Sequence, residues 1–313
     1  KKKKKKKKKK KESFLSGPAR LAAHFCPAQA MLQRLSSQVA RRARGIASAP
    51  LRVDLSGHVG VVTGSTSGIG EAMAKGLAAS GAHVVLNGLG DAGAIEALRA
   101  DIEKQYGVRV LYHSANMLSA EETADLVHFT KKELGRVDIL VNNAGVQHVA
   151  PVEEMPVGKW DAIIGINLSS AFHTIRAAVP IMKEQGRGRI VNVSSAHGLV
   201  ASPYKSAYVA AKHGIMGLTK AVALEVAEAG ITVNAICPGY VRTPLVEGQI
   251  ADTAKARGIT EEEVIRDVML LAQPTKKFVT NEELVGALLF LASDSSANVT
   301  GTHLSVDGGW VAR

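Results

Sequence analysis

From residue 51 onward, short apolar runs alternate with longer stretches in which apolar residues recur every three or four positions. The short runs are apolar on both faces, as in strands buried within a parallel sheet, and the longer stretches are typical of amphipathic helices. Strands are expected at residues 58–63, 84–86, 108–113, 138–141, 189–193, 232–236 and 303–306. Helices are expected at residues 70–79, 92–106, 121–134, 155–180, 204–227 and 282–291, the long one at 155–180 ending at a proline. This alternation predicts a single doubly wound α/β domain over residues 51–313, with helices on both faces of the sheet.

Residues 245–280 interrupt the alternation. This excursion lies between the sixth and seventh expected strands and holds Gln249, a charged helix-like stretch around residues 261–271, and Pro274. Long excursions of this kind are more often lids or specificity elements than structureless connections. The sequence therefore favours a lid over a plain surface connection.

The first fifty residues differ from the rest. They hold eleven Lys, five Arg and a single acid, Glu12, whereas residues 51–313 have a net charge of −4. The overall pI of 9.6 is therefore no argument for nucleic-acid binding by the domain, since the basic charge lies outside it. We expect residues 1–50 to be a disordered basic segment, with the initial lysine run either an artefact or a solvated tail.

Residues 31–50, which begin with Met31, contain four Arg, three Ser and no acid. This composition is typical of a mitochondrial transit peptide, so the expected location is the mitochondrial matrix after cleavage near Ala49. A floppy basic arm or a translated upstream region is the alternative, with a cytoplasmic location. Only Cys26 and Cys237 are present, which excludes a disulfide framework. No uninterrupted apolar stretch approaches the roughly 18 residues of a membrane span.

A glycine-rich turn directly follows the first expected strand and opens a helix. It runs from Thr63 through Gly64, Gly68 and Gly70. Gly64 permits a tight turn, Gly68 allows a ligand to approach the backbone, and Gly70 allows the helix to pack near the strand. N–H groups at a helix start attract a pyrophosphate, so the turn predicts a dinucleotide site.

The same region favours NAD over NADP. Asn87 stands at the end of the second expected strand, where an acid often binds the ribose, and Lys75 is the only Lys or Arg in residues 64–90. Lys75 lies beyond the start of the helix, so a 2′-phosphate finds no guanidinium partner. After the fourth strand, the amides of Asn142 and Asn143 either hold the backbone beside the ribose or form a simple Asx turn.

Tyr208 and Lys212 are four positions apart on one expected helix, so their side chains share a face. A phenol has a pKa of about 10, and a nearby ammonium stabilises the phenolate. Such a pair can exchange a proton with a substrate oxygen. Ser195 follows the strand at 189–193, at the carboxyl edge where ligands bind, and its hydroxyl is suited to polarising a carbonyl.

Together, the TGxxxGIG motif at residues 63–70, NNAG at 142–145, Asn167, Ser195, the Tyr208–Lys212 pair and Pro238-Gly239 resemble the short-chain dehydrogenases/reductases. The resemblance covers residues 54–313 and implies a Rossmann fold. It implies that Tyr208 is the general acid/base, that Lys212 lowers its pKa and holds the nicotinamide ribose, that Ser195 positions the reacting oxygen, and that Asn167 supports a water relay. Where the family commonly has Asp beside adenine, this chain has Asn116. The expected cofactor-binding residues are Gly64, Ser65, Thr66, Ser67, Gly68, Ile69, Gly70, Asn87, Asn116, Asn143, Ala144, Gly145, Tyr208, Lys212, Pro238, Gly239, Val241 and Thr243.

Polar residues also fall where a nicotinamide ring should lie. Gln147 and His148 follow NNAG, His197 follows Ser195, Lys205 precedes Tyr208, and Gln249 lies in the excursion. A positive charge or hydrogen-bond donors from Lys205 and His197, with neutral donors from the glutamines, suit a small carboxylate. Trp310 either walls the pocket against a short alkyl group or is a packing aromatic.

The stretches around these residues resemble members of the family that act on short hydroxy acids. That likeness implies reversible oxidation of an (R)-3-hydroxy acid to its keto acid with NAD, in a homotetramer. It implies that Gln147, Ser195, His197, Lys205, Tyr208, Gln249 and Trp310 contact the substrate. The alternatives are a 3-oxoacyl reductase, which should have NADP-binding bases and a basic surface, a non-catalytic dinucleotide-binding scaffold, and a nucleic-acid binder using the basic arm.

Overall fold

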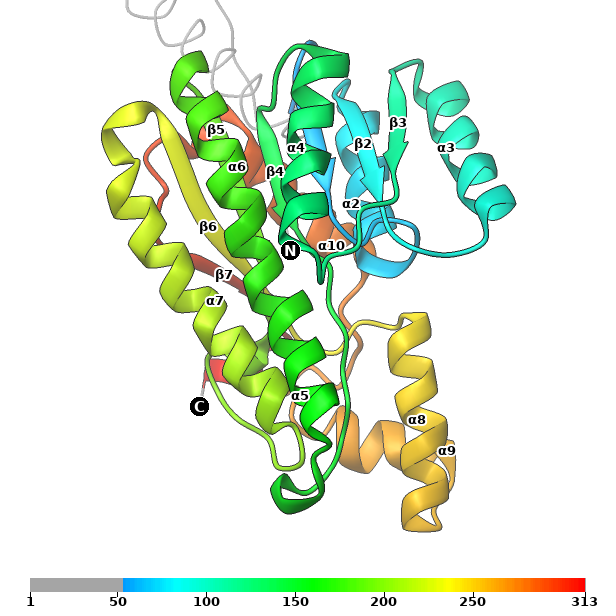
Figure 1. Cartoon of the computed structure of the whole chain (residues 1–313). Helices are drawn as coiled ribbons and strands as arrows, with labels where there is room; N and C mark the ends of the chain where they lie inside the picture. Colours follow the sequence, from blue (N-terminus) through cyan, green and yellow to red (C-terminus); the bar gives the residue numbers. More distant parts are fainter. Residues whose placement is uncertain (1–52, 313) are drawn as a thin grey trace, which may run out of the picture. The chain divides into compact units, whose positions relative to one another are not determined.

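The computed structural model describes residues 53–312, in which seven parallel strands form one sheet (Figure 1). The strands are β1 (Val59–Val62), β2 (His83–Asn87), β3 (Val110–His113), β4 (Ile139–Asn142), β5 (Gly188–Val193), β6 (Ile231–Pro238) and β7 (His303–Val306). Their order is β3-β2-β1-β4-β5-β6-β7, and each neighbouring pair is parallel. The predicted doubly wound sheet is therefore confirmed. The predictions on residues 1–50, including the transit peptide and Cys26, lie outside the described residues.

Helices cover both faces of this sheet. The helical segments are α2 (Gly68–Ala79), α3 (Ala92–Tyr106), α4 (Ala120–Leu134), η1 (Val152–Glu154), α5 (Val157–Ile164), η2 (Gly165–Ser169), α6 (Ser170–Gln185), η3 (Ala196–Gly198), α7 (Ser206–Glu225), η4 (Ala227–Ala229), α8 (Pro244–Arg257), α9 (Glu261–Glu263), η5 (Val264–Met269), α10 (Asn281–Ala292), η6 (Asp294–Ser296) and η7 (Trp310–Ala312). α2, α3 and α10 lie on one face, and α4, α6 and α7 lie on the other (Figure 1).

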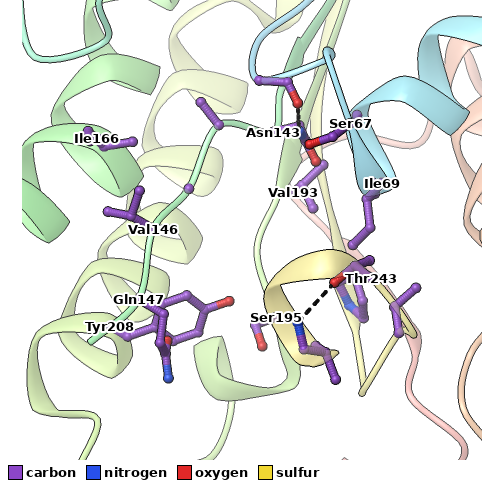
Figure 2. A pocket seen from close by; sticks show the side chains of 18 of the residues that line it. Ser67, Ile69, Asn143, Val146, Gln147, Ile166, Val193, Ser195, Tyr208 and Thr243 are labelled. Carbon is purple, nitrogen blue, oxygen red and sulfur yellow. Dashed lines mark hydrogen bonds between the residues drawn. The ribbon is translucent and has the colours of Figure 1, made fainter. Parts of the chain in front are cut away.

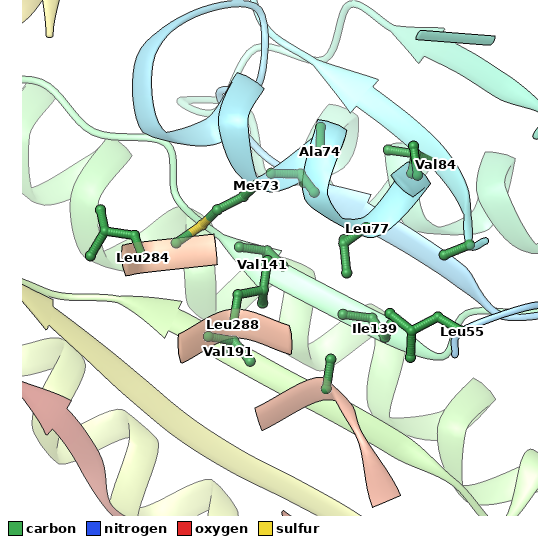
Figure 3. Packing of buried hydrophobic residues seen from close by; sticks show 14 of the residues in the cluster. Leu55, Met73, Ala74, Leu77, Val84, Ile139, Val141, Val191, Leu284 and Leu288 are labelled. Carbon is green, nitrogen blue, oxygen red and sulfur yellow. The ribbon is translucent and has the colours of Figure 1, made fainter. Parts of the chain in front are cut away.

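Each face of the sheet packs into its own apolar cluster, because successive strand residues point to opposite sides. On one side, Val62 and Ile139 of the sheet pack with Leu77 of α2 and Leu288 of α10 (Figure 3). On the other side, Val61 belongs to the cluster under α4, α6 and α7. This arrangement explains why most strand positions are apolar, whichever face of the sheet they point to.

The long helical run ends five residues later than the sequence predicts. The sequence predicted a stop at Pro180, but Pro180 lies inside α6, which continues to Gln185 and ends at Gly186 in a left-handed conformation. A proline inside a helix removes one backbone hydrogen bond. The helix continues past it because Ile181 and Met182 bury against the sheet.

By length and mean hydropathy, one helical run within residues 53–312, Val157–Gln185, is long and apolar enough to cross a membrane. In this fold the run is 44% buried over its most apolar window. α6 packs on β4, β5 and α4, as a core helix of a parallel sheet does.

The excursion after β6 folds into helices of its own. Thr243 caps α8 by accepting a hydrogen bond from the backbone N–H of Val246 at 3.4 Å, and Ile250, Val264 and Met269 form a separate apolar cluster. The sequence indicated only the second helical stretch of this excursion, around residues 261–271. Its role as a lid stays a prediction.

Candidate active site

The glycine-rich turn places the start of α2 against a cavity. Gly64 and Gly68 have positive φ values of 61° and 58°, which glycine adopts without strain. A Cβ atom on Gly70 would lie 2.2 Å from the carbonyl oxygen of Gly64, so only glycine fits there. Ser67, the N-cap residue of α2, makes no side-chain capping hydrogen bond. The first-turn N–H groups and the positive end of the helix dipole therefore remain available to an anionic ligand.

Asn143 links this turn to the end of β4. Its Nδ2 donates to the carbonyl oxygens of Thr63 at 3.0 Å and Gly64 at 2.9 Å. The Thr63 hydroxyl accepts from the backbone N–H groups of Asn143 and Ala144, both at 3.0 Å. The Asn143 amide therefore holds the backbone of the glycine-rich turn, and its place beside a ribose stays a prediction.

Two residues expected to bind the cofactor, Ser65 and Asn87, have side chains that instead make hydrogen bonds within the protein. Ser65 is fully buried and does not line the cavity; its hydroxyl donates to the Val62 carbonyl at 2.7 Å. The Asn87 side chain accepts from the N–H of Gly64 at 3.2 Å and donates to the Ala115 carbonyl at 2.9 Å. Its amide is therefore committed to holding the turn, although Asn87 lines the cavity.

The cavity has a volume of about 460 Å³ and extends along the carboxyl edge of the sheet (Figure 2). Figure 2 shows Ser67, Ile69 and Asn143 toward one end and Tyr208, Gln147 and Ser195 toward the other. The expected residues that line it are Gly64, Thr66, Ser67, Gly68, Ile69, Gly70, Asn87, Asn116, Asn143, Ala144, Gly145, Gln147, Ser195, His197, Lys205, Tyr208, Lys212, Pro238, Gly239, Val241, Thr243, Gln249 and Trp310. The fold thus brings the candidate cofactor and substrate residues to one cavity, while Ser65, Asn167 and His148 lie outside its lining.

Tyr208 and Ser195 meet at the end of the cavity that holds the residues expected to bind substrate, here called the substrate end. A hydrogen bond with Ser195 favours the phenolate, but burial dominates and raises the pKa of Tyr208 to about 12. The Lys212 ammonium lies 5.6 Å from the centre of the Tyr208 ring and donates to the Val193 carbonyl at 2.7 Å. Burial lowers the pKa of Lys212 to about 8.

Burial dominates the pKa of Tyr208 in this geometry, and the lowering by Lys212 that the resemblance implies stays a prediction. The ammonium lies over the ring face and is bound to a main-chain carbonyl.

Asn167 lies in the π-helical turn η2 and is buried. Its Oδ1 accepts from the backbone N–H of Val146 at 2.8 Å, and its Nδ2 donates to the Val146 carbonyl at 3.0 Å. Both ends of the amide are thus engaged with the residue before Gln147. In this geometry Asn167 holds the Gln147 loop, and the role in a water relay expected from the resemblance stays a prediction.

Lys205 and His197 differ in charge. Burial lowers the pKa of Lys205 to about 8, so the ammonium remains charged at neutral pH. Burial, and then the nearby Lys205 charge, lower the pKa of His197 to about 3. His197 is therefore a neutral imidazole, with its Nε2 2.8 Å from the Ser202 hydroxyl. Of the two, only Lys205 offers a positive charge.

Aromatic rings close this end of the cavity. Trp310 packs edge-on against His197, with ring centres 4.9 Å apart, and stacks on Tyr240 at 5.2 Å. Tyr240 also lines the cavity and was missed by the sequence reasoning. Its position directly after Pro238-Gly239, at the carboxyl end of β6, was the available signal.

The glycine turn, the Tyr208–Lys212 pair and Ser195 around one cavity define a dehydrogenase site on a Rossmann-like sheet. A family model, short chain dehydrogenase, matches residues 58–254, and the chain belongs to this family. It is an enzyme whose family membership implies a nicotinamide cofactor.

Two curated relatives are similar over nearly their whole length. The chain is 60% identical over 253 residues to a D-beta-hydroxybutyrate dehydrogenase of Rhizobium meliloti (strain 1021), covering 81% of this chain and 98% of the relative. It is 53% identical over 260 residues to a D-beta-hydroxybutyrate dehydrogenase of Cupriavidus necator, covering 83% of this chain and all of the relative. Among solved structures, a putative short-chain alcohol dehydrogenase from Sinorhizobium meliloti 1021 matches with a TM-score of 0.75 and 36% identity, covering 83% of this chain and 99% of that one.

Proposed function

We propose that this enzyme interconverts (R)-3-hydroxybutyrate and acetoacetate, with NAD as its cofactor. The observation that carries the proposal is Lys205, a largely buried, charged ammonium that lines the same cavity as Tyr208 and pairs with no carboxylate among residues 53–312. A buried charge without a partner is costly, so such a site suits an anionic ligand. The two D-beta-hydroxybutyrate dehydrogenase relatives support the same substrate.

The residues present fit a nicotinamide dinucleotide. Gly70 lets the start of α2 pack directly against the carbonyl oxygen of Gly64, and this uncapped helix start offers N–H groups to a pyrophosphate. Lys205 and Lys212 are the only cationic side chains among the cavity-lining residues, and both lie at the substrate end. No lining base thus accompanies the end of β2, where a 2′-phosphate would need one. This supports NAD rather than NADP.

The reaction needs a base for the hydroxyl proton and an acceptor for the hydride from C3. When bound, NAD would supply the hydride acceptor and a positive charge in the site. Tyr208, as the phenolate, takes the hydroxyl proton, while the Ser195 hydroxyl holds the same substrate oxygen. Because burial raises the pKa of Tyr208 to about 12, the phenolate depends on added positive charge near its oxygen. In the reverse direction Tyr208 returns the proton to the ketone oxygen.

The substrate end of the cavity also offers groups for the carboxylate and the alkyl end of the substrate. Lys205 supplies the charge for the carboxylate, and Gln147, Gln249 and neutral His197 supply further polar groups. Trp310, stacked on Tyr240, limits the room for the alkyl end. A short hydroxy acid meets both requirements. A 3-oxoacyl carrier substrate, the alternative considered from sequence, has no carboxylate for Lys205.

Steady-state kinetics with four substrate–cofactor combinations tests this proposal. We expect turnover of (R)-3-hydroxybutyrate with NAD, at least tenfold lower kcat/KM with NADP, and little turnover of the (S)-isomer. The methyl ester of (R)-3-hydroxybutyrate is the matched control, because it keeps the reacting carbon and lacks the charge. Equal kcat/KM for the ester and the acid would overturn the assignment of a carboxylate site.

We further propose a homotetramer located in the mitochondrial matrix. Val157, Trp160 and Phe172 on α5 and α6 are 74%, 38% and 47% exposed, and assembly would cover such side chains. Light scattering on the purified enzyme tests the homotetramer, and a monomer would contradict it.

The mitochondrial location is supported by the arginine-rich, acid-free composition of residues 31–50. N-terminal sequencing of the protein from cells tests this location, and an intact N-terminus upstream of Met31 would contradict it.

A further inference from the structure

Tyr240 lies where the chain leaves β6, and its backbone is fixed on both sides. Its N–H donates to the buried Oε1 of Gln273, and its carbonyl accepts from the N–H of Val279 at 2.9 Å. Its ring packs against the apolar cluster of the excursion, which includes Ile250. The ring therefore has a defined position at the wall of the cavity.

The Tyr240 side chain contacts both main features of the substrate end. Its ring stacks on Trp310 with an interplanar angle of 18°. The Lys205 ammonium donates to the Tyr240 hydroxyl at 3.3 Å and lies 5.4 Å from the centre of its ring. Tyr240 thus joins the aromatic wall to the positive charge.

Lys205 has no other side-chain partner to orient it within residues 53–312. The hydrogen bond to Tyr240 is its one side-chain hydrogen bond in that part of the chain, and no carboxylate pairs with it there. A lysine side chain has four rotatable bonds, so an ammonium held by a single neighbour depends on that neighbour for its position. The other titratable groups at this end of the cavity are His197, Tyr208 and Lys212.

We propose that Tyr240 is a positioning residue whose hydroxyl holds the Lys205 ammonium at the place where the substrate carboxylate binds. This proposal rests on the proposed function, since it assigns a role within the carboxylate site. It makes substrate affinity depend on an oxygen atom that lies outside the Ser195–Tyr208–Lys212 set.

Tyr240→Phe tests the role because it removes only the hydroxyl and keeps the stacked ring. We expect the KM for (R)-3-hydroxybutyrate to rise about tenfold, equivalent to about 1.4 kcal/mol. The kcat, the KM for NAD and the melting temperature should change little. Tyr204→Phe is the matched control, because Tyr204 is an exposed tyrosine next to Lys205, and it should leave all four values unchanged. An unchanged KM in Tyr240→Phe would overturn the proposal.

A double-mutant cycle with Lys205→Met separates positioning from a general effect on the pocket. If Tyr240 acts through Lys205, Tyr240→Phe should raise the KM by less than twofold in the Lys205→Met background. A tenfold rise in both backgrounds would show that the hydroxyl acts independently of Lys205 and would overturn the positioning role.

Acetate binding makes the test independent of turnover. Acetate is a small carboxylate without a hydroxyl group that the enzyme could oxidise. Calorimetry on the NAD-loaded enzyme gives the Kd for acetate. We expect Tyr240→Phe to weaken acetate binding about tenfold and Tyr204→Phe to leave it unchanged. If the unaltered enzyme fails to oxidise (R)-3-hydroxybutyrate but shows this difference, the proposed function fails and the role of Tyr240 stands. Equal Kd values, or no acetate binding by the unaltered enzyme, would overturn the role of Tyr240.

Discussion

Replacing Lys205 with methionine is expected to stabilise the folded protein in the absence of substrate while weakening substrate binding. Methionine has a similar length and no charge, so it fills the space without a desolvation cost. The cost of burying the ammonium follows from its pKa, which burial lowers from 10.5 to about 8. At about 1.36 kcal/mol per pH unit, this corresponds to roughly 3 kcal/mol.

The net gain in stability is smaller, because the variant also loses the hydrogen bond to Tyr240. Such a bond contributes about 1 kcal/mol, which leaves about 2 kcal/mol and a rise in melting temperature of about 4–8 °C. Below pH 8 the lysine is charged in both the folded and the unfolded state, so the burial cost is fully present. Between pH 8 and 10.5 the folded lysine loses its proton first, and the cost declines. The advantage of Lys205→Met is therefore largest below pH 8 and disappears above pH 10.5.

Urea denaturation of the cofactor-free protein at pH 7 and pH 10 measures the stability difference directly. Steady-state kinetics at pH 7 should show a rise of about 10- to 100-fold in the KM for (R)-3-hydroxybutyrate, because the variant loses one charge-assisted hydrogen bond to the substrate carboxylate. Lys104→Met, at an exposed lysine of α3, is the matched control and should change neither quantity appreciably. A Lys205→Met protein that is less stable at pH 7, or that keeps its KM, would refute the reasoning.

Two further predictions concern the glycine turn and the imidazole. Gly70→Ala places a Cβ atom 2.2 Å from the Gly64 carbonyl oxygen, so NAD binding measured by calorimetry should weaken at least tenfold. Gly217→Ala, in an open position of α7, should leave NAD binding unchanged. Equal affinities of the two variants for NAD would contradict the role of the glycine-rich turn in NAD binding. Since burial lowers the pKa of His197 to about 3, its ring signals in NMR spectra should not titrate between pH 5 and 8. A midpoint for His197 in that range would show that its ring is charged near neutral pH.

The sheet could be predicted from sequence because its central strands, β1, β4, β5 and β6, are buried on both faces. β1 is apolar throughout, so its position followed from composition alone. The helix ends were harder, since Pro180 is a local stop signal that the packing of Ile181 and Met182 overrides. α8 was missed because only one apolar side chain of its described residues, Ile250, is deeply buried, which leaves little periodic signal.

The site residues were largely predictable, but their electrostatics were not. Tyr208, Lys212 and Ser195 follow from spacing and from the edges of strands. The charge of His197 and the raised pKa of Tyr208 both depend mainly on the burial of their side chains. Both are three-dimensional properties.

Tyr240 illustrates the same limit. It stacks on Trp310, which lies 70 positions later in the chain, and only the pairing of β6 with β7 brings the two together. Its contact with Lys205 likewise joins segments that are 35 positions apart. A tyrosine after a Pro-Gly pair carries no sequence signal for either contact.

The transfer of deuterium from (R)-3-hydroxybutyrate labelled at C3 tests the central claim most directly. Mass spectrometry of the reduced cofactor should show one deuterium per turnover with the unaltered enzyme, because hydride leaves C3 as Tyr208 takes the hydroxyl proton. Tyr208→Phe should transfer almost none while binding NAD normally. Undiminished transfer by Tyr208→Phe, or reduced cofactor that carries no deuterium, would contradict the account.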